Sequence, residues 1–252
     1  RPAGEVTWNG TSGNNTWQQA VSENFLYEGE TSVMANGDDV IFDDDAASTT
    51  VVIKGAVHPN SVTFNNETKS YTLSGDSIVG KTLTINGAGG VTFNNWNRVS
   101  STVINAGKVT VSMLANTKGQ DWGSLGKSSS AITLNDGATL VTNGVIITDQ
   151  SMKISGEVSL EVPSGKSVIF NKAIKGSGAV LSKLGAGSME LGTAANTFAK
   201  LVIKNGVVTS NYSSSNAETL PGTVEFYNGT LWGANMESGS GVSNTTNFIV
   251  KL

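Results

Sequence analysis

Short apolar stretches alternate with polar turns along most of this chain. In most of these stretches apolar side chains occupy every second position, which predicts strands with one buried face. Their spacing of roughly eight to twelve residues is typical of sandwiches, barrels and β-solenoids, so the chain is predicted to be all-β. In the first half they occur at 40–42, 51–53, 62–64, 71–73, 83–85, 91–93, 103–104 and 109–111.

Internal repetition favours a solenoid over the other all-β folds. The pentapeptide Val-Thr-Phe-Asn-Asn occurs at 62–66 and again at 91–95, and strand-plus-turn units that end in Gly recur at 83–87, 132–137 and 201–206. Such repetition predicts stacked coils of about 20 to 30 residues, each of which buries its inward side chains against the next. Asn-Gly is also a hairpin turn signal, so a β-sandwich is the alternative.

The segment 175–192 is close to the pattern G-x-G-x-L-x-K-x-G-x-G-x-L-x-L, with one more residue before the first Leu and Met189 in place of the second, and it leads into Asn-Thr-Phe at 196–198. It resembles the autotransporter-associated β-strand repeat, as does the strand–Asn-Gly–strand continuation over 201–208. The opening of the chain, with Thr-Trp-Asn-Gly at 7–10, is similar to the start of such passenger segments. The resemblance implies a right-handed parallel β-helix exposed outside a bacterial cell.

A free-standing β-helical domain of this size is also similar to the xylan-binding β-helical carbohydrate-binding modules of bacterial plant-cell-wall hydrolases. We therefore expect one domain over 1–252, a solenoid with capped ends and a long inserted loop. The N-terminal cap is expected over 1–36, with coils and a C-terminal cap over 37–252. Trp8 and Trp17 are expected to cover the N-terminal end and Trp232 the C-terminal end.

Composition narrows the function classes. Charged residues make up 14% of the chain, against roughly 25% in an ordinary soluble domain, and the formal net charge is −4. Without a cluster of Lys and Arg, nucleic-acid binding is not expected. The chain has no cysteine, which excludes disulfides and zinc–thiolate sites. No apolar run approaches the length of a membrane-spanning helix. We expect a monomeric protein that lies outside the cell.

Catalytic patterns are not found. Pectin-cleaving β-helix enzymes use patterns such as Gly-His-Gly and Arg-x-Lys. The single histidine, His58, precedes Pro59 without flanking glycines, and neither Arg1 nor Arg98 stands in an Arg-x-Lys pattern. A Ser-His-Asp triad would need a serine and an acid around His58 in space, and the sequence does not place them. We therefore expect a protein that is not an enzyme.

The densest negative charge surrounds the apolar stretch at 40–42. Asp43, Asp44 and Asp45 follow this stretch directly. Several carboxylates at a strand end form the oxygen-rich setting that calcium prefers, so these residues are a candidate calcium site. The alternative is a solvated acidic edge that opposes pairing with strands of other chains.

Aromatic residues in polar turns indicate a binding surface. Sugar rings pack against Trp and Tyr while neighbouring polar side chains select among the hydroxyl groups. Trp96 lies in a polar turn and Trp122 in the segment 116–130, the longest without an apolar triplet, and Tyr227 is expected to face outward. Long loops on a solenoid often bind ligands. The polar neighbours expected to bind sugar are Asn97, Arg98, Gln120 and Asp121.

The sequence thus predicts a non-catalytic carbohydrate-binding module for a plant cell-wall polysaccharide, a hemicellulose such as xylan. Its partners would be that polysaccharide and a covalently linked glycoside hydrolase. The alternative function is a structural or adhesive passenger segment of a bacterial surface protein. A pectin-active β-helix enzyme is the third hypothesis.

Overall fold

The alternating apolar positions become strands with one buried face. In β5 (Asp39–Phe42), Val40 and Phe42 are buried while the residues between and before them are partly exposed, and β7 (Ser61–Phe64) repeats this pattern. All eight stretches predicted in the first half lie within strands, so these predictions are confirmed. Burying a large apolar side chain contributes about 1.5–3 kcal/mol, which makes these rows the main source of stability.

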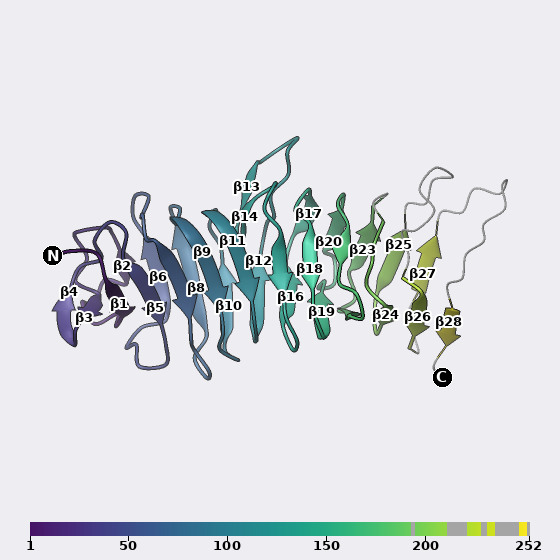
Figure 1. Cartoon of the computed structure of the whole chain (residues 1–252), viewed down its shortest axis with the longest axis horizontal. Helices are drawn as coiled ribbons and strands as arrows, with labels where there is room; N and C mark the ends of the chain where they lie inside the picture. The colour runs from purple at the N-terminus through teal and green to yellow at the C-terminus, as the bar shows by residue number, and fades with distance from the viewer. Residues whose placement is uncertain (193–194, 211–220, 228–230, 235–246, 251–252) are drawn as a thin grey trace.

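The computed structural model describes residues 1–192, 195–210, 221–227, 231–234 and 247–250. Within them the chain forms a β-solenoid of about eight turns without any helix, and the coils stack along one long axis (Figure 1). Strands in successive coils pair in parallel, so the predicted parallel β-helix is confirmed. The β-sandwich alternative is wrong, because its sheets would be antiparallel.

Two sheets run along the solenoid and a third begins in its second half. The first sheet contains, in spatial order, β21 (Ile174–Lys175), β18 (Met152–Ile154), β15 (Ile132–Leu134), β11 (Arg98–Ile104), β9 (Val79–Ile85), β7 (Ser61–Phe64), β5 (Asp39–Phe42), β1 (Glu5–Trp8), β3 (Phe25–Tyr27) and β4 (Glu30–Ser32). The second contains β2 (Thr16–Trp17), β6 (Thr50–Ile53), β8 (Tyr71–Gly75), β10 (Gly90–Phe93), β12 (Lys108–Val111), β16 (Thr139–Thr142), β19 (Glu157–Glu161), β22 (Val180–Leu184), β24 (Lys200–Ile203), β26 (Thr223–Phe226) and β28 (Asn247–Val250). The third contains β17 (Val145–Thr148), β20 (Ser167–Phe170), β23 (Ser188–Leu191), β25 (Val207–Ser210) and β27 (Leu231–Ala234).

One coil is longer than its neighbours. Val62 pairs with Leu83, 21 positions later, whereas Val109 pairs with Leu140, 31 positions later. The additional residues include the antiparallel hairpin of β13 (Trp122–Gly123) and β14 (Gly126–Lys127), which rises from one side of the solenoid in Figure 1. The predicted inserted loop over 116–130 is therefore confirmed, although part of it is a short hairpin.

The N-terminal end is closed by aromatic side chains and a hairpin. Trp8 and Trp17 are fully buried, with ring centroids 5.3 and 5.8 Å from that of Phe25. β3 pairs antiparallel with both β1 and β4. However, β1 already pairs in parallel with β5, so the first coil begins inside the segment predicted as cap. The side chain of Trp232, expected to cover the other end, lies outside the described residues.

The repeated pentapeptide does not mark equivalent positions. Its first copy forms β7 of the first sheet and its second forms β10 of the second sheet. What the copies share is the corner that follows, because Asn66 and Asn95 are both buried there. The Nδ2 of Asn66 donates to the Lys69 carbonyl at 2.6 Å, and that of Asn95 to the Asp76 carbonyl at 2.8 Å.

A ladder of asparagines joins four coils at the C-terminal ends of the strands of the first sheet. The Nδ2 of Asn86 donates to Oδ1 of Asn65 at 3.0 Å, and that of Asn105 donates to Oδ1 of Asn86 at 2.7 Å. The next coil continues the ladder from Asn135 to Asn105 at 2.6 Å. Identical side chains in register satisfy one another's donors and acceptors, so the recurring asparagine after a strand has a structural reason.

The segment that resembles the autotransporter repeat forms two stacked turns. Between β22 and β23 the chain turns at Gly185, and between β24 and β25 it turns at Gly206, directly above. A Cβ on Gly206 would lie 2.6 Å from the carbonyl oxygen of Gly185, so the approach of the two turns requires glycine. Lys183 is fully buried beneath them, and burial lowers its pKa to about 8.

No described segment is a helix that could cross a membrane.

Candidate functional site

Trp96 forms one wall of a small polar pocket on the outside of the solenoid. The tryptophan follows β10 and leaves 45% of its surface exposed. The pocket has a volume of about 180 Å³ and spans two adjacent coils. Its lining consists of Trp96, Gly75, Asp76, Ser77, Asn94 and Asn95.

The alternation of β10 continues into this turn and sets which side chains face outward. Asn95 and Asn97 are buried, whereas Trp96 and Arg98 are exposed. Oδ1 of Asn97 accepts the backbone N–H of Ile78 at 3.1 Å, and its Nδ2 donates to a carbonyl oxygen of the inserted loop at 2.8 Å. The expectation that Asn97 binds ligand is therefore wrong, because its polar atoms already join two coils.

Asn95 has a buried, unsatisfied acceptor close to the tryptophan. Its Nδ2 donates to the Asp76 carbonyl at 2.8 Å and to Oδ1 of Asn97 at 2.9 Å. Its Oδ1 is buried and has no hydrogen-bond partner among the described residues. A buried carbonyl oxygen normally has a donor. This oxygen has almost no accessible surface, so a ligand in the pocket would reach it only if the amide moved. The corner amide of Asn66 also lacks an Oδ1 partner in the described part of the chain, but Asn66 does not line the Trp96 pocket.

The second predicted tryptophan lies on the inserted hairpin. Trp122 is partly exposed, and Nζ of Lys127 lies 5.6 Å from its ring centroid. Asp121 pairs with Lys127 at 3.6 Å and accepts a hydrogen bond from Ser128. The backbone carbonyl of Gln120 accepts the N–H of Asn116 at 2.6 Å. Asp121 and Gln120 thus help to fold the insert, and both remain partly exposed.

The structure brings the two tryptophan-bearing segments together without joining their rings. The N–H of Asn97 donates to the carbonyl of Gly123 at 3.0 Å, and these residues directly follow Trp96 and Trp122. No contact between the two rings occurs in the described structure. Trp96 and Trp122 therefore lie on adjacent coils but do not form one continuous stacking surface.

Tyr227 belongs to a different part of the surface. It is 40% exposed as predicted, and Nζ of Lys204 lies 6.0 Å from its ring centroid. It follows β26, which is six strands away from β10 in the second sheet. At about 4.8 Å per strand this separation is roughly 30 Å, so a short ligand cannot contact both Tyr227 and Trp96.

The acidic residues after β5 hold the neighbouring coil. The carboxylate of Asp44 accepts the backbone N–H groups of Glu67, Thr68 and Lys69, and these hydrogen bonds, that from Lys69 first, lower its pKa. Asp43 accepts the N–H of Asp45 at 3.0 Å. No group of three or more potential metal-binding side chains occurs among the described residues, so the arrangement does not support the predicted calcium site.

Sequence reasoning missed the polar half of the Trp96 pocket. Asp76, Ser77 and Asn94 were not predicted, although Asp76 and Ser77 lie about one coil before the tryptophan. The coil length of roughly 20 residues was the signal that could have placed them. It was hidden because the repeated pentapeptide suggested a spacing of 29 positions.

The chain matches no protein family, no curated protein and no solved structure.

Proposed function

We propose that this domain is a non-catalytic carbohydrate-binding module that holds a plant cell-wall polysaccharide, a hemicellulose such as xylan, at the Trp96 pocket. The observation that carries the proposal is an exposed tryptophan directly beside a small pocket that is lined by polar residues. A pyranose ring would pack its C–H face on the indole while its hydroxyl groups bond to the pocket.

The polar groups around Trp96 suit hydroxyl groups. Ser77 and Asn94 line the pocket with accessible groups that both donate and accept hydrogen bonds. Oδ2 of Asp76 accepts the N–H of Gly55 at 2.8 Å, which fixes this carboxylate at the rim. A hydrogen-bonded site of this kind selects among sugars by the positions of their hydroxyl groups.

The single histidine does not stand in a Ser-His-Asp triad. Nδ1 of His58 lies 3.2 Å from Oε1 of Gln19, and the backbone N–H of His58 donates to the same oxygen at 2.7 Å. A Ser-His-Asp triad instead needs a carboxylate on one ring nitrogen and a hydroxyl group on the other. Binding would act by holding a linked glycoside hydrolase near its substrate, which raises the effective substrate concentration.

Affinity electrophoresis tests the proposal first. The purified domain would migrate through gels that contain xylan, mixed-linkage glucan, xyloglucan, mannan or pectin. We expect retardation by one hemicellulose and at least an about tenfold loss of affinity in Trp96→Ala, since a central aromatic contact typically contributes more than 1–2 kcal/mol. Circular dichroism and the unfolding midpoint should not change, because Trp96 is exposed.

Tyr227→Ala is the matched control, because it removes a similarly exposed aromatic ring about 30 Å away. A trisaccharide of the retained polymer should bind this variant as it binds the native domain. Migration without retardation in every gel, or a Trp96→Ala variant with unchanged affinity, contradicts the proposal. That outcome would favour the structural or adhesive passenger segment.

A further inference from the structure

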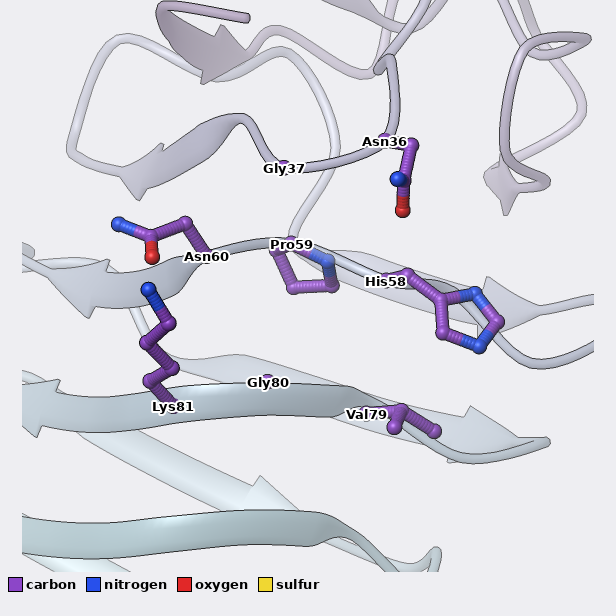
Figure 2. A pocket seen from close by; sticks show the side chains of 8 residues that line it. All are labelled: Asn36, Gly37, His58, Pro59, Asn60, Val79, Gly80 and Lys81. Carbon is purple, nitrogen blue, oxygen red and sulfur yellow. The ribbon is translucent and has the colours of Figure 1, made fainter.

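A second hollow crosses the first coils, away from the Trp96 pocket. Its floor consists of Gly37, Pro59 and Gly80, which occupy the same position in three successive coils (Figure 2). Because the two glycines have no side chain and the proline ring is buried, the floor is low and apolar. The groove has a volume of about 390 Å³ and runs parallel to the solenoid axis over roughly 10 Å, the distance across three stacked strands.

Polar side chains line both rims of this groove. Figure 2 shows Asn60 and Lys81 on one side of Pro59, and His58 and Val79 on the other side. The amide of Asn36 continues the second rim in the preceding coil. Apolar floor and polar rims together are the usual composition of a site for a short oligosaccharide.

The cations at this groove have no carboxylate partner. Lys81 is exposed and forms no salt bridge in the described structure. Arg98 lies in the following coil and pairs with Val79, so it extends the rim formed by His58 and Val79. Arg98 also forms no salt bridge in the described structure. Unpaired cations on both rims are notable in a chain whose formal net charge is −4.

The neighbouring acidic side chains are already engaged. Asp38 is fully buried and receives two hydrogen bonds from the guanidinium group of Arg1, at 2.8 and 2.6 Å. Asp39 accepts hydrogen bonds from Nδ2 of Asn60 and from Oγ of Ser61. The hydrogen bond from Asn60 turns its donor toward Asp39 and leaves its carbonyl oxygen free to accept from a hydroxyl group. Asp39 keeps its negative charge, because both of its donors are neutral, so the two cations Lys81 and Arg98 exceed the acidic charge beside the groove by one.

We propose that this groove over Pro59 is a separate site for a carboxylate-bearing oligosaccharide, a chain of uronic acid residues. The sugar rings lie over the low floor of the groove and against the partly exposed Val79, a carboxylate lies between Lys81 and the arginine rim, and hydroxyl groups bond to the amides of Asn36 and Asn60. The groove spans about two sugar rings at the coil spacing of roughly 4.8 Å. The proposal does not depend on binding at the Trp96 pocket.

The test uses a pair of ligands that differ only in charge. The acid is the trisaccharide of α-1,4-linked galacturonic acid, and the control is its fully methyl-esterified form, which keeps the backbone and removes every carboxylate. NMR titration of the whole chain should show saturable shifts of the Gly37 and Gly80 amide signals with the acid. We expect the ester to bind at least about tenfold more weakly, and the difference should vanish in 1 M salt, where screening acts within about 3 Å.

Protein variants locate the site. Lys81→Met keeps the length of the side chain but removes its charge, and we expect an about fivefold loss of affinity for the acid, with a further loss when Arg98→Gln is added. Lys153→Met removes an equally exposed lysine on β18, three strands from β9 in the first sheet, and should have no effect.

Equal binding of acid and ester, or unchanged affinity in Lys81→Met, would overturn the assignment. Shifts confined to the Trp96 turn would do the same. Trp96→Ala should leave the titration with the acid unchanged, so failure of this site and failure of the hemicellulose site are distinguishable. An absence of shifts at millimolar acid would also refute the proposal.

Discussion

Replacing Lys183 with methionine would show how strongly buried lysine holds adjacent coils together. Nζ of Lys183 donates to the carbonyl oxygens of Leu184, Gly185 and Asn205, at 2.9, 2.7 and 3.1 Å. The first two belong to its own coil and the third to the next coil. Methionine has a similar length and fills the space with an apolar chain, but it donates no hydrogen bond.

The expected loss is about 1 to 2 kcal/mol in the free energy of unfolding, from two opposing contributions. The Leu184 carbonyl also accepts the N–H of Val162, so the carbonyls of Gly185 and Asn205 are the two that lose their donor. Each fully buried acceptor without a partner costs about 1–3 kcal/mol. Gly185 is only partly buried and Asn205 is exposed, so water replaces part of the lost donation. Part of this cost is offset because the variant no longer buries an ammonium group, whose burial is unfavourable.

The pH dependence gives a second, independent signature of Lys183. Burial lowers its pKa to about 8, below the ordinary value of 10.5. Between these values the unfolded chain binds more protons at this group than the folded chain, so its contribution to stability rises with pH. Lys183→Met lacks this contribution. The stability difference between the native protein and the variant should therefore widen from pH 8 to pH 10.

Urea unfolding at several pH values, combined with hydrogen exchange, measures both effects. Because each coil contacts only its neighbours, loss of protection should concentrate in β22 to β25 and spare β5 to β12. Lys153→Met is the control, because this lysine lies exposed on β18. A loss below about 0.5 kcal/mol, typical of surface substitutions, or a difference that narrows with rising pH would refute the reasoning.

Three further predictions concern contacts between coils. Asp44→Asn should lower the thermal midpoint at pH 7 but not at pH 2. The lowered pKa of Asp44 stabilises the fold above about pH 4, and this stabilisation is lost on acidification. A difference between the two midpoints in calorimetry that persists at pH 2 would contradict this prediction. Asn86→Ala removes two ladder bonds and should cost about 1 to 2 kcal/mol in urea unfolding, with no loss contradicting a stabilising ladder. Gly107→Ala should lower the free energy of unfolding by at least about 1 kcal/mol more than Gly137→Ala. Both glycines have a positive φ, but only the Cβ at position 107 would lie 2.5 Å from the Gly87 carbonyl oxygen. Equal unfolding midpoints of the two variants would refute this prediction.

The strands were predictable because burial follows the period of two along each coil. Val62 and Phe64 face inward and Thr63 outward, as their hydrophobicity indicates. Which sheet a strand joins was less accessible. The two copies of Val-Thr-Phe-Asn-Asn look equivalent in sequence, yet they lie in different sheets. They are identical because each precedes a corner that requires a buried asparagine. The identical pentapeptide therefore indicates a corner of the coil, but it does not indicate which sheet the preceding strand joins.

The error at Asn97 has a similar origin. From Val91 to Val99 every odd-numbered side chain is buried, so the inward direction of Asn97 follows from the same alternation that placed Val91 and Phe93 in a strand. Composition suggested a solvated turn, because the segment contains four polar residues around Trp96. The buried side chains of Asn95 and Asn97 instead form hydrogen bonds to backbone groups of the neighbouring coils.

Binding surfaces on a solenoid depend on residues one coil apart, and this dependence limits what a sequence can predict before the coil length is known. His58 and Arg98 were considered separately in the sequence, the first as a turn residue and the second as a neighbour of Trp96. With coils of about 20 residues, the first sheet places His58 beside Val79 and Val79 beside Arg98. The same offset places Asp76 next to Trp96. Both candidate sites therefore follow from stacking, and a change in length of one coil would separate their residues while leaving every strand prediction intact.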